Sequence, residues 1–244
     1  MVIKFDRYFS PAGENRGIHL YLPDDYYGSQ ERYPVLYMFD GHNLFFDSDA
    51  TFGKCLGLKD FLDHWGKKMI VVGLACATDD IQRVQEYCPY HIQSRIYGDL
   101  WGRGDETINW MVQELKPWID QNYRTWPFRE ATAIAGYSMG GMMSLFTVLR
   151  YNRWFSKAAV ISPALLPAME HFKREIQDSP FPRTPESFSA GEPPRIPRKK
   201  CGIWSRASGI WNIWCSARVC KRIFSARRAV SITNPAGSSS CRCG

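Results

Sequence analysis

Short apolar runs separated by mixed polar stretches dominate the first three quarters of the chain. Residues 34–40, 69–74, 131–136 and 157–162 are almost continuously apolar, which is typical of strands buried on both faces of a parallel sheet. Residues 16–22 alternate apolar and polar positions, which predicts a further strand. Strands that alternate with helical stretches predict an α/β fold with a mostly parallel sheet flanked by helices.

An amphipathic helix is predicted after residue 105. Apolar residues recur there at three- and four-residue spacing, as Ile108, Met111, Val112, Leu115, Trp118 and Ile119. Asp105 is placed to cap the start of this helix. Pro117 is expected to distort it locally, because proline removes a backbone donor and crowds the preceding turn.

The periodicity stops near residue 182. Residues 183–200 are rich in proline, and residues 205–244 mix isolated Trp and Ile with Arg, Cys and Ser. We therefore predict an α/β core over residues 1–182, which lacks the C-terminal strands and helix of a complete fold. Residues 183–244 are predicted to be a basic tail, rich in Cys, Ser and Pro, with little regular structure.

Charge and cysteine divide at the same place. The net charge of +7 arises because residues 183–244 hold 12 Lys and Arg against 2 Glu, whereas residues 1–182 hold 19 against 22 acidic residues. Five of the 8 cysteines lie in the last 44 residues, without the paired spacing of a zinc site. We expect neither a metal nor a cofactor.

The chain has no apolar run of the roughly 18 residues that a membrane helix requires. Residues 1–6 lack the charged start and apolar middle of a signal peptide. These features predict a cytoplasmic protein without a membrane partner. The oligomeric state stays open.

The strongest chemical signal is Gly136-Tyr137-Ser138-Met139-Gly140. A buried strand precedes this Gly-x-Ser-x-Gly sequence and a helical stretch follows it, which is the context of a nucleophile elbow. A glycine-rich turn without chemistry is the alternative, and the flanking pattern favours the elbow. Ser138 is thus the predicted nucleophile of acyl transfer.

Acyl transfer also needs donors for the oxyanion and a histidine oriented by an acid. The backbone N–H of Met139 is one predicted donor, and the second is expected from the loop after residue 40, at His42, Asn43 or Leu44.

No histidine completes a triad. His42 precedes the nucleophile, whereas the base follows it in α/β hydrolases, so a loop-shaping or substrate-facing role is favoured. His171 is the one histidine after Ser138 and lies in a predicted polar helix. His19, His64 and His91 are expected to be structural or surface residues, and the triad acid and histidine stay unassigned.

Two segments, residues 33–45 and 133–141, resemble the oxyanion-loop and nucleophile motifs of the putative esterase family of α/β hydrolases, which is related to enterochelin esterases and S-formylglutathione hydrolase. Residues 83–89, 114–120 and 162–165 resemble further family segments. The resemblance implies a serine carboxylesterase acting on small-molecule acyl esters without a cofactor. It covers about residues 1–182.

Beyond residue 182 the family would supply a strand ending near Ser-Trp-Gly, the catalytic acid, a helix, and a strand leading to the catalytic histidine. Residues 183–191 can be coded so that the neighbouring reading frame gives Asp-Thr-Arg-Val-Phe-Phe-Ser-Trp-Gly. Residues 231–238 similarly permit His-Asn-Glu-Pro-Ser-Trp-Glu, which resembles the segment around the family's histidine. We therefore hypothesise that the tail is an out-of-frame translation of an esterase gene, which leaves this chain crippled.

Two other functions remain. The fold could bind a ligand near Ser138 without turning it over. Residues 195–228, in which Trp204, Trp211 and Trp214 lie among Lys and Arg, could contact nucleic acid. Nothing besides composition supports nucleic-acid binding by these residues. We therefore expect no nucleic-acid partner.

Overall fold

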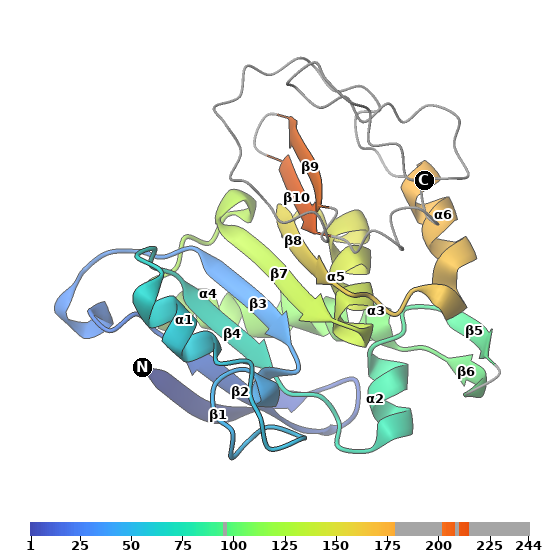
Figure 1. The fold of residues 1–244 in the computed structure, drawn as a ribbon, viewed down its shortest axis with the longest axis horizontal. Helices are drawn as coiled ribbons and strands as arrows, with labels where there is room; N and C mark the ends of the chain where they lie inside the picture. The colour runs from blue at the N-terminus through green and yellow to red at the C-terminus, as the bar shows by residue number, and fades with distance from the viewer. Residues whose placement is uncertain (95–96, 179–201, 208–209, 215–244) are drawn as a thin grey trace.

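A sheet with the strand order β1-β2-β4-β3-β7-β8-β10-β9 forms the centre of the structure (Figure 1). This computed structural model describes residues 1–94, 97–178, 202–207 and 210–214, with the backbone alone for residues 94, 178 and the last two segments. The strands of this sheet are β1 (Val2–Phe9), β2 (Glu14–Tyr21), β3 (Val35–Phe39), β4 (Ile70–Leu74), β7 (Thr132–Tyr137), β8 (Lys157–Ile161), β9 (Gly202–Ala207) and β10 (Ile210–Trp214). A separate hairpin comprises β5 (His91–Ser94) and β6 (Gly98–Trp101).

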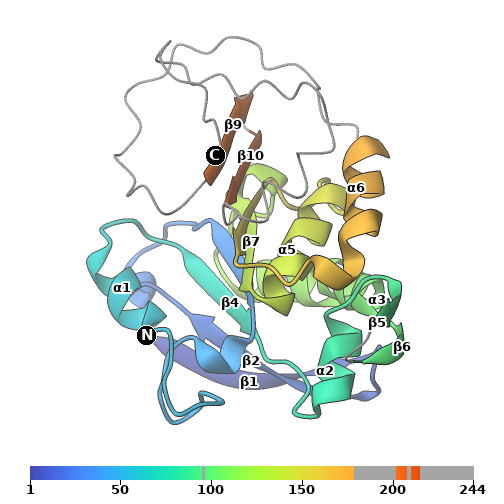
Figure 2. The same cartoon turned by 45° about the vertical axis from the view of Figure 1, so that its right-hand side comes forward.

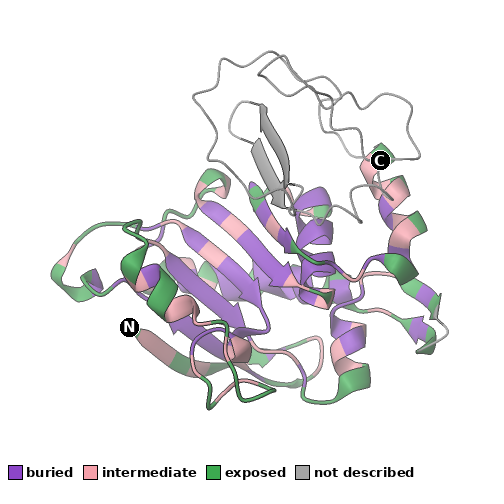
Figure 3. Cartoon of the chain, in the orientation of Figure 1, coloured by how far each residue is buried: buried purple, intermediate pink, exposed green. Residues whose placement is uncertain are grey.

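The predicted strands and their parallel arrangement are confirmed. β3 pairs in parallel with β4 and β7, and β7 pairs in parallel with β8, while β1, β2 and β4 are antiparallel neighbours. Both faces of the central strands are covered, as Figure 3 shows in purple. Because side chains alternate between faces, Val35, Tyr37 and Phe39 join one apolar cluster, and Met38 joins another on the opposite face.

Helices cover both faces of the sheet. The larger cluster includes residues of α3, the π-helical segment and α4, together with α5, whereas Leu62 of α1 lies in the smaller cluster. Helices α5 and α6 lie side by side (Figure 2). The longer helical elements are α1 (Leu58–His64), α2 (Asp80–Glu86), α3 (Gly104–Trp110), the π-helix Met111–Leu115, α4 (Lys116–Asn122), α5 (Met139–Arg150) and α6 (Met169–Asp178). In the described part of the chain, none of the helices has the length and apolar character needed to cross a bilayer.

The predicted amphipathic helix forms, but its start and its middle differ from expectation. Arg103, not Asp105, occupies the N-cap position, and the Asp105 carboxylate in the first turn accepts a hydrogen bond from Tyr151 at 2.9 Å. The distortion expected near Pro117 takes the form of the π-helical turn at residues 111–115. The wider turn lies just before Pro117, whose ring crowds the preceding turn of an α-helix.

Two strands lie within the tail that we expected to have little regular structure. β10 pairs in parallel with β8, and β9 pairs antiparallel with β10. Both segments contain Ile and Trp, which favour extended structure, and the expectation of little regular structure over residues 183–244 stays a prediction. The remaining tail residues lie outside the described residues.

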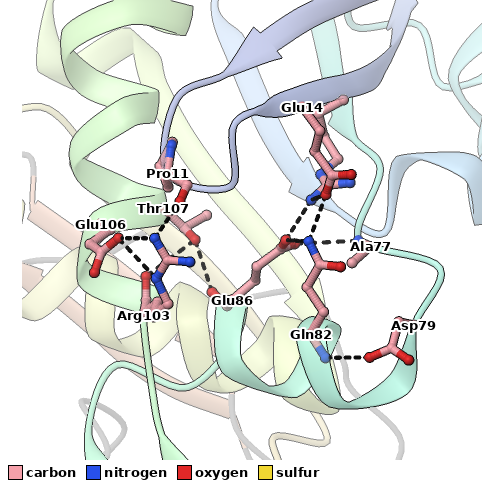
Figure 4. Close-up of polar contacts among 10 residues, drawn as sticks. Pro11, Glu14, Ala77, Asp79, Gln82, Glu86, Arg103, Glu106 and Thr107 are labelled. Atoms are coloured by element: carbon pink, nitrogen blue, oxygen red, sulfur yellow. Dashed lines mark hydrogen bonds and ion pairs between the residues drawn. The ribbon is translucent and has the colours of Figure 1, made fainter.

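Helix α2 is tied to its surroundings by a buried ionic network (Figure 4). Arg16 of β2 donates to Glu86 at 2.5 Å, and both side chains are less than a tenth exposed. Glu86 also accepts the backbone N–H of Ala77, and its carbonyl accepts Thr107 Oγ1 at 3.0 Å. Burial raises the pKa of Glu86, although Arg16 opposes that shift. The network therefore fixes α2 against β2 and α3.

Removing the buried carboxylate should destabilise the protein. We expect Glu86→Ala to lower the free energy of unfolding by about 3 kcal/mol, because Arg16 then keeps only its partly exposed partner Glu14. Chemical denaturation would measure this loss. Glu170→Ala is the control, because Glu170 pairs with Lys173 on the surface and should change stability little. If Glu86→Ala and Glu170→Ala lost equal free energies of unfolding, the buried pair of Glu86 with Arg16 would not have the structural role assigned to it.

Candidate active site

Ser138 occupies a strained turn between β7 and α5. Its backbone has φ 54° and ψ −118°, a region that L-residues seldom adopt, and it is the N-cap of α5. Its side chain is exposed and makes no capping hydrogen bond to the helix. Strain of this kind costs about 1–3 kcal/mol and persists only where surrounding contacts impose it. The local geometry is that of a nucleophile elbow.

The glycines of the motif are required by close packing. A Cβ on Gly136 would lie 2.4 Å from the carbonyl carbon of Gly140, and one on Gly140 would lie 2.9 Å from Cβ of Phe39. A Cβ on Gly141 would lie 2.8 Å from the carbonyl oxygen of Ile161. Strand and helix can thus cross only where side chains are absent.

Backbone hydrogen bonds from β8 and the segment after it hold the serine turn. The N–H of Ser138 donates to the carbonyl of Ile161 at 3.1 Å, and the carbonyl of Ser138 accepts the N–H of Ala164 at 2.9 Å. Ser162 lies between these partners and also has a positive φ, of 41°. The conformation of Ser138 is therefore imposed from its own strand, its helix and its neighbour β8.

The predicted oxyanion loop is a 3₁₀ turn, Gly41–Asn43, directly after β3. The N–H of Asn43 donates to the carbonyl of Asp40 at 2.9 Å, and the N–H of Leu44 donates to the carbonyl of Gly41 at 3.3 Å. Two of the three candidate loop donors are thus engaged within the turn. The N–H of His42 is the remaining candidate donor in the loop. The other predicted donor is the N–H of Met139, which is half-buried at the start of α5.

Side chains link this loop to β7, the strand that leads into Ser138. Asn43 Nδ2 donates to the hydroxyl of Tyr137 at 3.0 Å, and Asn43 Oδ1 accepts the N–H of Thr51 at 2.8 Å. His42 Nε2 lies 3.0 Å from Thr51 Oγ1, and burial lowers the pKa of His42. The His42 imidazole thus connects the loop to Thr51, in keeping with the loop-shaping role expected for it.

A buried ion pair lies beneath the loop. The Asp40 side chain is 1% exposed, and its carboxylate accepts hydrogen bonds from Arg83 of α2 at 3.0 to 3.2 Å. Asp40 itself is left-handed, with φ 57° and ψ 47°. A side chain on Gly140 would begin 3.5 Å from Asp40 Oδ2, so the carboxylate borders the elbow.

Asp40, His42 and Cys76 bring one potential metal-ligand atom each to within 4.8 Å of one another. Burial, with Asp40 adding to it, raises the pKa of Cys76 to about 12. The carboxylate of Asp40 is already engaged by Arg83, which neutralises the charge that a cation would need. We therefore read this group as part of the loop support.

No described imidazole forms a hydrogen bond with Ser138. The ring of His171 stacks on Tyr90 with centroids 4.5 Å apart, and its Nδ1 lies 3.5 Å from Arg174. His19 is buried, His64 contacts the carbonyl of Asp60, and His91 pairs with Asp99 at 2.6 Å. The triad acid and histidine predicted by the family resemblance have no counterpart among the described residues.

A cavity of about 450 Å³ opens beside the oxyanion loop. Its lining combines apolar side chains with charges of both signs: Phe45, Phe46 and Leu56, with Asp47, Lys54, Lys59 and Asp60. The N–H of Leu56 donates to the carbonyl of Asn43 at 2.9 Å, which ties the cavity wall to the loop.

Sequence reasoning missed the pair between Asp40 and Arg83. Both residues lie in segments that resemble the family, but no periodicity indicates that a side chain on α2 reaches a turn after β3. The same holds for the contact between Asn43 and Tyr137.

Comparison with known proteins places these features in a family. The sequence profile described as Putative esterase matches residues 10–240. Esterase Rv1288 of Mycobacterium tuberculosis (strain ATCC 25618 / H37Rv) is 33% identical over 150 residues, which are 62% of this chain and 29% of that protein. The chain thus spans less than a third of the length of this curated relative.

Solved structures share the fold. An IroE-like serine hydrolase from Shewanella oneidensis superposes with a TM-score of 0.59 at 21% identity, covering 73% of this chain and 55% of its own. The enterobactin esterase FES from Shigella flexneri gives a TM-score of 0.54 at 15% identity, covering 72% and 43%.

The packing of the elbow can be tested by adding one methyl group. We expect Gly136→Ala to lower the free energy of unfolding by about 2 kcal/mol or more, because the new Cβ meets backbone atoms that cannot move aside. Denaturant unfolding followed by tryptophan fluorescence would measure this. Gly28→Ala is the matched control, since nothing lies within 4 Å of its Cβ position, and should change stability by about 0.5 kcal/mol at most. A Gly136→Ala protein as stable as the control would refute the close crossing.

Proposed function

The chain belongs to the Putative esterase family, and from this premise we propose that Ser138 is the nucleophile of a serine carboxylesterase acting on small-molecule acyl esters. One observation carries the proposal: Ser138 is exposed at a strained positive φ between a buried strand and a buried helix. The Gly-x-Ser-x-Gly motif selects the same serine, and the backbone strain at Ser138 supports that choice. The names of related proteins support esters as the substrate class.

The proposed reaction begins with attack of Ser138 Oγ on the acyl carbon. The carbonyl π electrons move to the oxygen, which the N–H groups of Met139 and His42 would stabilise. Collapse of this intermediate expels the alcohol, which takes up the serine proton, and leaves an acyl-enzyme. Water then attacks the same carbon, releases the acid and restores the hydroxyl. These steps need no metal or cofactor.

Among the described residues, no group is placed to accept the proton of Ser138. Without an imidazole beside it, a serine hydroxyl is a poor nucleophile at neutral pH. Loss of triad members lowers turnover by several orders of magnitude even where oxyanion donors remain. We propose that the chain with this tail sequence is, for this reason, an esterase with little activity.

A non-catalytic role is the second candidate, and the same missing base favours it. The elbow, the oxyanion loop and the adjacent cavity could hold an ester or acid without turning it over. A nucleic-acid role for residues 195–228 is less favoured. Most of that stretch lies outside the described residues, and the side chains of β9 and β10 within it are not described either.

The reading frame of the tail decides between an active and a crippled enzyme. We propose that residues from about 183 are an out-of-frame translation and that the neighbouring frame encodes the missing acid and histidine. The strand that follows β8 in that frame would take the place beside β8 that β10 occupies here. Most of these residues lie outside the described part of the chain.

Esterase activity of this chain should be low, and Ser138 should contribute little to it. We expect this chain to hydrolyse p-nitrophenyl acetate at a rate close to that of Ser138→Ala, because no base takes the serine proton. Absorbance of released p-nitrophenol, corrected for the uncatalysed reaction, would measure the rate. Ser48→Ala is a matched control for an exposed serine away from the elbow. A high rate in this chain that Ser138→Ala abolishes would show that a base is present after all.

Resequencing the coding DNA across residues 182 and 183 tests the frame. We expect restoration of the neighbouring frame to raise hydrolysis of short acyl esters by about a thousandfold or more, since a complete triad is then present. Ser138→Ala in the restored protein should abolish the gain. No gain on restoration would favour the non-catalytic candidate.

A further inference from the structure

Asp40 connects the two halves of the proposed active site. All of its polar groups are engaged: its N–H donates to the Tyr87 hydroxyl at 3.0 Å, its carbonyl accepts from Asn43, and its carboxylate accepts from Arg83. Asp is one of the few non-glycine residues that tolerate a left-handed backbone, but the conformation still needs support. Asp40 receives that support from two residues of one segment, Arg83 and Tyr87.

The next residue leaves no alternative path for the backbone. A Cβ on Gly41 would lie 2.3 Å from the carbonyl carbon of Gly73, so this residue packs directly on β4. The backbone conformation of Asp40 therefore sets the direction of the turn and, with it, the position of His42 two residues later. A carboxylate oxygen of Asp40 lies within 4.8 Å of a ring nitrogen of His42, so Asp40 borders the loop directly.

The helix that carries Arg83 is itself held in place by contacts of neighbouring residues. Glu86, one turn further along α2, is bound by Arg16, and the N–H of Arg103 donates to the carbonyl of Gln85 at 2.7 Å (Figure 4). Gln82 donates to Glu14 at 2.6 Å. Since α2 is anchored to β2 and to the start of α3, its arginine can hold Asp40 without moving toward it.

We propose that Arg83 is a positioning residue of the oxyanion hole. By binding both carboxylate oxygens of Asp40, it keeps that residue left-handed, and the turn that follows then presents the N–H of His42 to the acyl oxygen at Ser138. This inference rests on the proposed function. Arg83 needs no contact with substrate for this role.

The guanidinium geometry explains why an arginine serves here. Nε and Nη2 of Arg83 both donate to Asp40 Oδ1, and Nη2 also reaches Oδ2, at 3.0 to 3.2 Å. A planar fork fixes the orientation of a carboxylate, whereas an ammonium group supplies charge without that geometry. Lysine at this position should therefore restore the charge balance but only part of the positioning.

The test uses phenylboronic acid with the full chain. Its trigonal boron accepts a lone pair from Ser138 Oγ, the serine proton passes to solvent, and the tetrahedral boronate places an oxygen in the oxyanion hole. ¹¹B NMR at mildly alkaline pH would measure the affinity. We expect Arg83→Met to weaken binding about tenfold or more, and Arg83→Lys to bind between Arg83→Met and the unmodified chain.

Arg16→Met is the matched control, because it also removes a guanidinium from a buried carboxylate that anchors α2, but it does not touch Asp40. Its boronate affinity should fall much less than that of Arg83→Met, by about twofold at most, because Gln82 and the N–H of Arg103 still anchor α2 and Arg83 still binds Asp40. Equal losses of affinity in Arg83→Met and Arg16→Met would overturn the inference, because both would then act only through the stability of α2.

Hydrogen exchange separates this inference from the proposed function. Amides of residues 40–44 should exchange faster in Arg83→Met than in Arg16→Met, whereas amides of β1 and β2 should not. If the unmodified chain shows no boronate binding beyond that of Ser138→Ala, the proposed nucleophile fails, and the exchange comparison alone decides the role of Arg83. Identical exchange at residues 40–44 in the two variants would overturn that role whatever the boronate result.

Discussion

The close crossing of β7 and α5 is the constraint on which the site depends. The backbone at Gly136 and Gly140 approaches so nearly that a Cβ added to Gly136 would lie 2.4 Å from the carbonyl carbon of Gly140, which is a severe steric clash. The chain must therefore reverse within one residue, and Ser138 takes up the positive φ that this reversal requires. Buried apolar packing of α5 on the sheet supplies the stability that holds the strain. The exposed Oγ is a consequence of this geometry.

The second half of the site depends on buried charge. Asp40 and Glu86 are both buried carboxylates, and each is paired with an arginine. Helix α2 supplies one member of each pair, Arg83 for Asp40 and Glu86 itself for Arg16. Such pairs contribute little net stability, since desolvation offsets most of the attraction, but they strongly disfavour arrangements in which either partner is left alone. They therefore specify where α2 lies and, through Arg83, how the turn after β3 is oriented.

The described core provides the proposed nucleophile and the proposed oxyanion loop, and no described histidine forms a hydrogen bond with Ser138. In the proposed mechanism, the loop and the elbow act on the substrate oxygen, whereas the missing imidazole would act on the serine proton. These parts come from different regions of the chain, so one can be complete while the other is absent. This separation explains how a well-packed hydrolase core can coexist with a tail of different composition.

The sequence by itself determined the strands, the order of sheet and helix, and the identity of Ser138. Apolar runs and the spacing of glycine around a serine are local features, and local sterics translate them directly into buried strands and a tight turn. It was misleading at Asp105, where a contact with Tyr151 replaced the expected cap, and it did not identify the two short strands of the tail. Only the tertiary structure decided that Arg83 reaches Asp40, that Asn43 reaches Tyr137, and that the turn itself engages the N–H groups of Asn43 and Leu44. Those contacts join residues up to 94 positions apart, and the folded sheet, rather than any pattern along the chain, brings them together.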